Sequence, residues 1–523
     1  MFEANPLLRS ILVLGLLVLG GCASLPDNSN RTESLHYTDT GDTPLGKLVE
    51  KRLPAHAEGQ SGYLLLPDGL DAFVARAVLA QRAERSIDTQ YYMWHDDEVG
   101  DLLAYQLLVA ADRGVRVRVL LDDIDEGGRD LNIAVFDRHP NIEARLFNPF
   151  GRNTGRTLQY VTGFGKQTRR AHNKTYTVDN QATILGGRNI GDEYFSADPN
   201  LAFADLDVLA IGPVAQEVSR SFDEYWNSPL SYPIATLVDT QPTEADLQQG
   251  QQRMADFTAA EKDSAYLQRL ADSDLSNSIR KKSVEFVWGD GKVYADPPEK
   301  LTQSTGDSDY QMWTDVKPYM ANAQQELIIL SPYFVPGKSG VSFLKQLRER
   351  GVRVRILTNS LASTDVGIVH AGYSRYRKAL LRAGVELYEL NEVTSKEERR
   401  AWSKGEIGRG KSSLHAKSFV IDREIVFIGS LNLDARSVVQ NTEIGVVLES
   451  AEIGGRVAYN FDQRIDEVGF RLALEEDEQG VEQLRWHGLV DGELVTFTAD
   501  PYTSFWRRFG IGFMRLLPIE SQI

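Results

Sequence analysis

The chain has 523 residues, of which 42% are hydrophobic and 25% charged, an ordinary globular composition with enough length for two sizeable cores. Its formal net charge of −17 argues against a nucleic-acid partner, because sequence-independent binding to phosphates needs a concentrated basic surface. Cys22 is the only cysteine, which excludes an intrachain disulfide, a CxxC redox pair and a cysteine-based zinc site.

The N-terminus has the pattern of a removable signal. Ile11 to Leu19 is an apolar run preceded by Arg9, and it is too short to cross a hydrocarbon core of about 30 Å. It leads into Leu19-Gly20-Gly21-Cys22, which resembles the lipobox of bacterial lipoproteins. We therefore expect a signal peptide over 1–21, lipidation at Cys22, and a lipidated N-terminus and tether over 22–55. The alternative is an uncleaved anchor with an incidental cysteine.

Both interpretations predict a bacterial protein that is anchored to a membrane and faces the periplasm. By the same resemblance, an aspartate after the cysteine would favour retention in the inner membrane, and this chain has Ala23 there. Sorting to the outer membrane is the default expectation, and the choice between inner and outer membrane stays open.

An internal repeat follows. Arg113 to Leu120 returns as Arg350 to Leu357, with alternating valine and arginine that predict a β-strand with one buried face. A helix-period segment and an apolar strand precede each copy, at Asp101 to Arg113 and Ser86 to Trp94, and at Ser342 to Arg350 and Glu326 to Tyr333. Strand, helix and strand in this order predict a βαβ unit in each half. The chain should contain two similar α/β lobes.

The composition sets the expected boundaries: a first lobe over 56–235, a helical connector over 236–300, a second lobe over 301–475 and a C-terminal extension over 476–523. The connector is rich in Gln, Asp and Ala and carries helix-period segments. In the extension, Tyr502 to Leu517 mixes aromatic residues with arginines. This segment either lies at a membrane interface or packs on its own lobe as a terminal helix.

One motif occurs in both halves with the same spacing. The first copy is His172-Asn173-Lys174, Asp179 and Gly186-Gly187-Arg188-Asn189; the second is His415-Ala416-Lys417, Asp422 and Gly429-Ser430-Leu431-Asn432. Alternate side chains of a strand share a face, so each histidine and lysine should project together. An imidazole, an ammonium and the amide of Asn189 or Asn432 are donors suited to phosphate oxygens.

Two such half-sites form a complete catalyst for a phosphodiester. One neutral histidine can attack phosphorus to give a phosphohistidine, while the other, protonated, donates its proton to the leaving alkoxide. Water or an alcohol then reverses the sequence of steps. This chemistry needs no cofactor and no metal, and we expect neither.

Acids downstream of each asparagine are candidates for orienting the histidines. Asp205 and Glu443 occupy matching strands, and each is expected to hold the second ring nitrogen of the histidine in its own lobe; Asp207 is the competing choice in the first lobe. Asp179 and Asp422 either take part in catalysis or bond local backbone in a turn between two strands. The two roles cannot be separated from spacing.

Two further histidines need interpretation. His95 stands beside Asp96, Asp97 and Glu98, but consecutive side chains point apart, so we expect a solvated loop and not a metal site. His370 follows the second Val-Arg strand, where loops of α/β proteins line clefts, and it is a candidate for substrate contact.

The paired motif resembles that of the phospholipase D superfamily. More narrowly, Tyr91-Tyr92-Met93-Trp94, Arg170 to Lys174, Gly187 to Phe195 and Leu517 to Ser521 look like bacterial cardiolipin synthases of the C type, and the likeness runs from about Leu64 to the C-terminus. It implies two phospholipase D-type lobes, each a mixed β-sheet flanked by helices, related by a pseudo-two-fold axis.

The resemblance also implies an activity: transfer of a phosphatidyl group to phosphatidylglycerol at a phospholipid membrane, with phosphatidylethanolamine as a donor and His172 as the nucleophile. Hydrolysis by the same site, as a phospholipase D or a secreted nuclease, is the alternative. A non-catalytic lipoprotein scaffold is disfavoured because both motif copies are intact. Cardiolipin is made at the inner membrane, whereas the lipobox predicts a location outward from it. The identity of the substrate therefore stays open.

Overall fold

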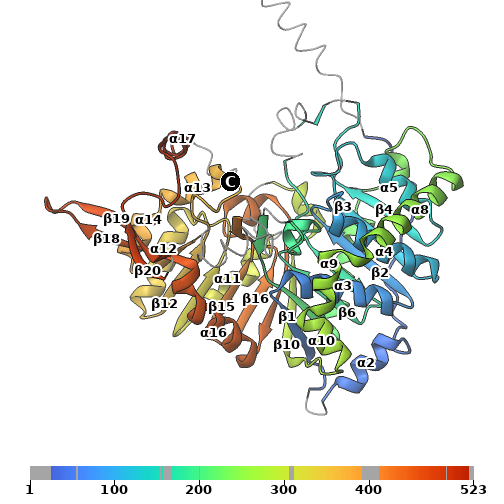
Figure 1. Ribbon diagram of the computed structural model, residues 1–523, viewed down its shortest axis with the longest axis horizontal. Helices are drawn as coiled ribbons and strands as arrows, with labels where there is room; N and C mark the ends of the chain where they lie inside the picture. The colour runs from blue at the N-terminus through green and yellow to red at the C-terminus, as the bar shows by residue number, and fades with distance from the viewer. Residues whose placement is uncertain are drawn as a thin grey trace, which may run out of the picture.

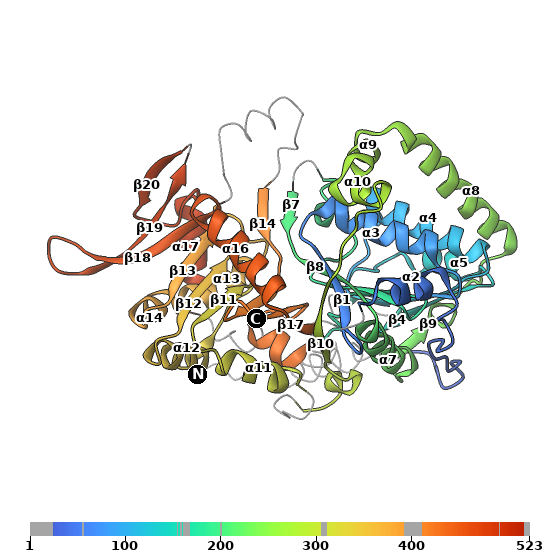
Figure 2. The same ribbon diagram turned by 90° about the horizontal axis from the view of Figure 1, so that it is seen from below.

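A computed structural model describes residues 25–54, 57–153, 155–156, 159, 168–198, 201–304, 311–391, 411–490 and 492–516. Two lobes lie side by side, the first drawn from blue to green and the second from yellow to red (Figures 1 and 2). Each has a mixed β-sheet with helices against it, which confirms the predicted two-lobed α/β fold.

In the first lobe the sheet order is β9–β4–β3–β2–β5–β6–β8–β1, and the neighbours β2, β3 and β4 are parallel. α3 and α4 cover one face and α7 the other (Figure 2). The bounds are β1 Ser61–Leu66, α3 Gly69–Arg82, β2 Ser86–Tyr91, α4 Glu98–Asp112, β3 Arg116–Asp122, α5 Asp130–Asp137, β4 Ile142–Phe147, β5 Thr175–Val178, β6 Ala182–Gly186, β7 Leu201–Ala204, β8 Asp207–Ile211, α7 Pro213–Asn227 and β9 Ser231–Pro233.

The second lobe repeats this arrangement in the order β13–β12–β11–β15–β16–β17 and adds a β18–β19–β20 extension at β13. Its bounds are α11 Trp313–Ala321, β11 Glu326–Leu330, α12 Gly337–Glu349, β12 Arg353–Thr358, α13 Gly367–Ser374, α14 Arg377–Arg382, β13 Glu386–Leu390, β14 Lys411–Leu414, β15 Ser418–Ile421, β16 Ile425–Gly429, β17 Ile444–Glu449, α16 Ala451–Val468, β18 Gly469–Glu476, β19 Glu482–Val490, β20 Glu493–Phe497 and α17 Phe505–Met514.

One strand joins the two sheets. β10, Val287–Ala295, pairs with β1 through its first three residues and with β17 through the remaining six. The rest of the expected connector contains α8 Glu244–Ala260, α9 Ala265–Asp272 and α10 Asp274–Arg280. These helices lie within the range predicted for the connector, which stays a prediction as a domain boundary, and β10 in the same range was not expected. Its backbone hydrogen bonds make the lobes share a β-ladder.

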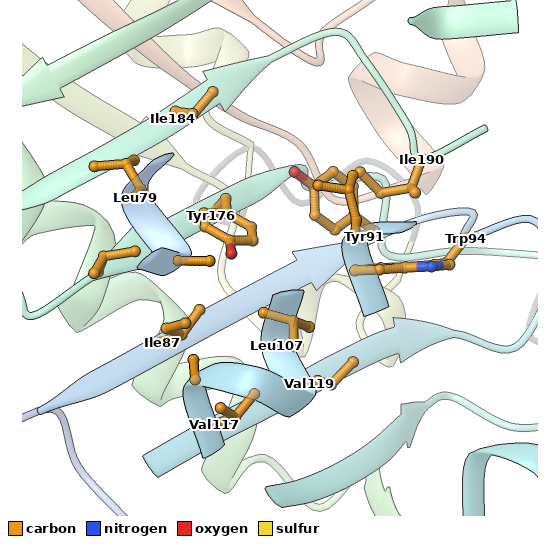
Figure 3. Close-up of a cluster of buried hydrophobic side chains, with 14 of the residues drawn as sticks. Leu79, Ile87, Tyr91, Trp94, Leu107, Val117, Val119, Tyr176, Ile184 and Ile190 are labelled. Carbon is orange, nitrogen blue, oxygen red and sulfur yellow. The ribbon is translucent and has the colours of Figure 1, made fainter. Parts of the chain in front are cut away.

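The repeated Val-Arg strands have both faces covered, so the expectation of a single buried face was wrong. In β3 the valines pack with Leu107 of α4 and Ile87 of β2 (Figure 3). On the opposite face Arg118 is buried too, because its guanidinium donates to Asp88 at 2.7 Å and to Asp223 at 2.8 Å. Paired carboxylates allow an arginine to occupy an interior position.

The described part of the expected tether lies against the first lobe. Arg31 donates to the carbonyl oxygen of Asn227 at 3.0 Å, and the imidazole of His36 lies 2.6 Å from the Asp223 carboxylate. α2, Pro44–Arg52, follows. Residues 1–24 with Cys22, and the segment Leu517 to Ser521, lie outside the described residues. No helix within the described ranges is both long and apolar enough to cross a bilayer.

Candidate active site

Each motif copy is built on a β-hairpin. His172 and Lys174 precede β5, and His415 and Lys417 precede β15, so the hairpins β5–β6 and β15–β16 carry the two half-sites. All four side chains are buried. The structure therefore places the repeated motif at equivalent positions of the two lobes.

The two half-sites are tied together by backbone from opposite lobes. The His172 amide donates to the carbonyl of Thr442 at 2.9 Å, and the His415 amide donates to that of Ala204 at 2.8 Å. Parallel pairing of β7 with β14 adds a second connection. Each histidine thus lies beside the segment of the other lobe that carries the candidate acid.

The carboxylates are exchanged between the lobes. Glu443 Oε2 lies 2.8 Å from His172 Nδ1, and Asp205 Oδ2 lies 2.6 Å from His415 Nδ1. The expected contact of an acid with a histidine ring is present, but the expected pairing within one lobe is wrong, because each acid precedes its strand, β8 or β17, at a point where the chain contacts the other lobe. The competing residue Asp207 instead accepts from Arg76 at 2.8 Å.

The two copies differ at the position before Arg188 and Leu431. A Cβ on Gly187 would lie 2.2 Å from Asp205 Oδ1, so glycine is required for that carboxylate to pack there. At the matching position Ser430 has a side chain, and its hydroxyl donates to Glu443 Oε2 at 2.5 Å. The close neighbour of Gly187 is therefore the acid that orients His415.

The lysines fold back on the histidine loops. Lys174 Nζ donates to the His172 carbonyl at 2.7 Å, and Lys417 Nζ donates to the His415 carbonyl at 2.5 Å. Burial lowers the pKa of Lys417 to about 8 and lowers that of Lys174 well below its usual value of 10.5, while Glu443 opposes the shift of Lys174. Two ammonium groups in one buried site create a field that suits an anion.

Burial lowers the pKa of His172 well below 6.5, and the positive charges of Lys174 and Lys417 lower it further, as does His415. Both imidazoles lie at the lobe interface, because each is bonded to an acid from the opposite lobe. The pKa of His415 is also lowered, by burial and by Lys417, but Asp205 opposes this shift.

The two acids differ in ionisation. Burial raises the pKa of Glu443 to about 7. Burial acts in the same direction on Asp205, but His415 and Lys417 outweigh it and lower the pKa of Asp205 below the usual 3.8. The ionised partner therefore faces His415, which favours keeping a proton on that imidazole.

The predicted phosphate-binding amides line the same region. Asn189 Nδ2 donates to the Tyr194 hydroxyl at 2.8 Å, and Asn432 Nδ2 lies 3.5 Å from the Ser437 hydroxyl. Both Oδ1 atoms are buried without a hydrogen-bond partner. Turning the Asn189 amide by 180° would let Oδ1 accept from Tyr194 and would release an N–H donor. Phosphate binding by the two asparagines stays a prediction.

Asp179 and Asp422 lie in the turns between two strands, as one of the two alternatives predicted, but their carboxylates bond backbone that is distant in sequence and not local. Both have positive φ, and each carboxylate accepts three consecutive backbone amides. Asp179 accepts from Glu84, Arg85 and Ser86 at 2.7–3.0 Å, and Asp422 accepts from residues 324–326 at 2.7–2.9 Å. These contacts hold the start of the neighbouring strand, β2 or β11, and use the carboxylates away from the histidines. Of the two roles considered, the structure favours the structural one.

Aromatic rings flank both histidines. Tyr92 meets the His172 ring edge-on at 4.9 Å between centroids, and Tyr194 and Phe203 each lie 5.1 Å from the His415 ring. Sequence reasoning did not assign these residues to the site. The signal available was position: Tyr92 directly follows β2, and Tyr194 follows the motif asparagine by five residues.

His95 does not stand alone in a solvated loop. Within the described ranges His95, Asp97 and Glu193 bring three possible metal ligands within 4.8 Å of one another. Glu193, 3.3 Å away, raises the pKa of His95, with Asp125 and Asp97 adding to the effect against burial. The three carboxylates favour the protonated imidazole, and their distances from it are those of ion pairs. The expected absence of metal stays a prediction.

His370 was a candidate for substrate contact, and that prediction was wrong. Its ring is buried and lies 2.8 Å from the Arg377 guanidinium, which also donates to Asp500 at 2.8 Å. The chain after β12 turns into α13, and the histidine faces the C-terminal extension.

A family model described as "Cardiolipin synthase, PLD-like domain" matches residues 78–226 and 316–465. The chain is 40% identical over 462 residues to cardiolipin synthase C of Escherichia coli K12, covering 88% of this chain and 96% of the relative. It is 31% identical over 520 residues to an uncharacterized protein of Helicobacter pylori strain 26695, covering 97% and 98%.

Among solved structures, the crystal structure of phosphatidylserine synthase from Haemophilus influenzae Rd KW20 matches with a TM-score of 0.54. The sequence identity is 14%, and the match covers 82% of this chain and 91% of that chain. At this identity the likeness concerns the fold alone.

Replacing the buried Asp205 should show whether this residue orients His415 or only supports folding. Because Asp205 raises the pKa of His415, Asp205→Asn should lower that pKa. The measurement is NMR titration of histidine-labelled protein, with the resonance assigned through His415→Ala. Asp179→Asn is the control, and it should leave the His415 pKa unchanged while lowering the free energy of unfolding by about 1–3 kcal/mol. An unchanged pKa in Asp205→Asn would contradict the exchanged pairing.

Proposed function

The chain belongs to the family of cardiolipin synthases with phospholipase D-like domains, and on that premise we propose that it is a phosphatidyltransferase that makes cardiolipin from phosphatidylglycerol and a second phospholipid. The observation that carries the proposal is the pair of imidazoles held by opposite lobes, each with Nδ1 against a carboxylate. This arrangement leaves Nε2 of each ring for chemistry at one phosphorus atom.

The first step transfers the phosphatidyl group to the enzyme. Nε2 of neutral His172 attacks the phosphorus of the donor lipid, the bond from phosphorus to the headgroup oxygen breaks, and His415 gives its proton to the leaving alkoxide. The product is a phosphatidyl-histidine and a free headgroup alcohol, which is ethanolamine when phosphatidylethanolamine is the donor. Glu443, bonded to His172 Nδ1, offsets the positive charge that develops on the ring.

The second step consumes the intermediate. A glycerol hydroxyl of phosphatidylglycerol gives its proton to His415, now neutral, and attacks phosphorus, which releases His172. One phosphodiester has replaced another, so the exchange requires no external energy source. Lipid concentrations then decide its direction.

The assignment of His172 as nucleophile is supported by electrostatics. The pKa of His172 is lowered well below 6.5 by burial and by two lysines, so its lone pair is available at neutral pH. His415 faces the ionised Asp205, which raises its pKa against burial. A single proton shared by the two rings therefore favours His415, the position of the acid.

The surroundings suit a phosphate held away from water. Lys174 and Lys417 supply positive charge to the non-bridging oxygens, and preorganised charge of this kind is usually the largest contribution to such catalysis. The rings of Tyr92 and Tyr194 pack edge-on against the imidazoles of His172 and His415. Since water and alcohols compete for the same intermediate, exclusion of water favours transfer over hydrolysis.

The N-terminal pattern supports a membrane location for this activity. We propose that signal cleavage before Cys22 leaves a lipidated N-terminus on the periplasmic side of a membrane. The described chain from Asn28 onward is bonded to the first lobe, so few residues separate the lipid from the folded body. The anchor would thereby keep the active site close to its lipid substrates.

Product analysis tests the proposed activity. The purified full chain, incubated with vesicles of phosphatidylglycerol and phosphatidylethanolamine, should yield cardiolipin and ethanolamine by mass spectrometry. His172→Ala and His415→Ala should each lower the rate by at least about 10²-fold, because each removes a group needed for proton transfer or attack. If phosphatidic acid were the only lipid product, the chain would be a hydrolase.

A substrate with a good leaving group should reveal the nucleophile. Phosphatidyl-p-nitrophenol releases a stable anion that needs no proton, so His415→Ala should still form the covalent intermediate. We expect about one equivalent of nitrophenolate per chain and a phosphatidyl adduct that peptide mapping places on residue 172. An adduct on residue 415 in the His172→Ala protein would reverse the assigned roles.

The single cysteine makes lipidation simple to test. In bacteria grown with labelled palmitate, the wild-type chain should carry label and begin at Cys22, and Cys22→Ala should carry none. N-terminal sequencing of an unlabelled wild-type chain that begins at Met1 would instead indicate an uncleaved anchor.

A further inference from the structure

The C-terminal helix α17 exposes large apolar side chains. Phe505, Trp506, Phe509, Phe513 and Leu516 are 62%, 75%, 60%, 61% and 80% exposed. Phe505, Phe509 and Phe513 recur every four residues and therefore share one face of the helix, and Leu516 follows just beyond its end. We call these five side chains the α17 aromatic face. Single exposed apolar residues are ordinary on soluble proteins, but five in one short segment need a partner.

The opposite face of α17 already packs on the second lobe. Ile511 is buried against Leu361 and Ala371, with Met514 beside them. Ser504 caps the helix by accepting from the Arg507 amide at 3.2 Å. In Figure 1 α17 projects beyond α13 at the rim of the lobe. Packing against the second lobe thus holds the helix in place, and the α17 aromatic face stays exposed.

Charge identifies the kind of partner. Between Tyr502 and Leu516 the chain has Arg507, Arg508 and Arg515 and no acidic residue, whereas the whole chain carries −17. Arg375 and Arg377 lie near enough to lower the pKa of Arg515, after burial as the main cause. A positive edge beside exposed rings matches a surface of anionic headgroups over acyl chains. A protein partner would offer no general reason for this combination.

α17 packs against a segment that also contacts the backbone next to His415. Leu361, which contacts Ile511, belongs to the segment between β12 and α13. In the same segment the Asn359 amide bonds both the N–H and the carbonyl of Leu414, the residue before His415. The segment that leads into α17 is held as well, because Asp500 pairs with the buried Arg377. The segment 359–361 therefore connects α17 with the backbone that carries the second half-site.

We propose that the α17 aromatic face inserts into the interfacial layer of an anionic phospholipid bilayer and positions the second lobe over its lipid substrates. The proposal rests on the proposed function for the identity of those substrates. The insertion itself is independent of turnover. It adds a second membrane contact, distinct from the lipid expected on Cys22.

Fluorescence quenching can test insertion despite the N-terminal anchor. The full chain is reconstituted in vesicles of phosphatidylglycerol and phosphatidylcholine with brominated acyl chains, and the signal of Trp506 is taken as the difference between wild type and Trp506→Phe. Bromine atoms shallow in the chains should quench this difference signal by at least about half. An unquenched Trp506 would overturn the proposal, whether or not the chain makes cardiolipin.

A kinetic comparison tests the positioning. Phe509→Ser combined with Phe513→Ser should lower the rate on vesicles at least about tenfold, because two buried rings are lost from the interface. The rate on the same lipids dispersed in detergent micelles should stay within about twofold, which also reports correct folding. Leu494→Ser, on the exposed strand β20, removes an apolar side chain of similar exposure and should change neither rate.

The alternative occupant is a second copy of the chain. In that case the wild type would run as a dimer in detergent, the double serine variant as a monomer, and Trp506 would be protected from bromine. Loss of the same fraction of activity on micelles and on vesicles would likewise overturn membrane positioning by α17.

Discussion

The exchange of carboxylates between the lobes is the constraint on which the site depends. His172 is oriented by Glu443 and His415 by Asp205, so neither half-site has its acid unless the other lobe is in place. The backbone bonds from Thr442 and Ala204, the β7–β14 pairing and the shared strand β10 all act to fix that interface. A lobe on its own would leave its imidazole without the acid that orients it.

The charges of the site follow from the same constraint. Two lysines and two histidines are buried together with two acids, and burial disfavours every ionised form. Burial lowers the pKa of His172, Lys174 and Lys417 and raises that of Glu443, so it favours the neutral form of each group. A phosphodiester bound between the two lysines would favour their charged forms, because an opposite charge nearby raises the pKa of an ammonium group.

Sequence reasoning reached the repeated lobes and the motif because both depend on local periodicity and spacing. The exchange of acids between the lobes could not be predicted, because the sequences around Asp205 and Glu443 match whichever histidine each acid contacts. The buried Arg118 was missed for a related reason: its partners Asp88 and Asp223 are distant in sequence. β10 was missed because its pairing, like that of any bridging strand, is decided by two sheets and not by its own residues. His370 illustrates the opposite error, where position after a strand suggested substrate contact and a distant Asp500 decided otherwise.

The two half-sites have diverged enough to perform different tasks. Where the first lobe has Gly187 beside Asp205, the second has Ser430, whose hydroxyl bonds the longer carboxylate of Glu443. Burial raises the pKa of Glu443 to about 7 although the Ser430 hydroxyl acts in the opposite direction, whereas His415 and Lys417 keep Asp205 ionised. The histidine facing the ionised acid keeps a proton more readily than the histidine facing a half-neutral one. The unequal charges around the two acids therefore give a symmetric fold an asymmetric proton, and attack at phosphorus requires that asymmetry.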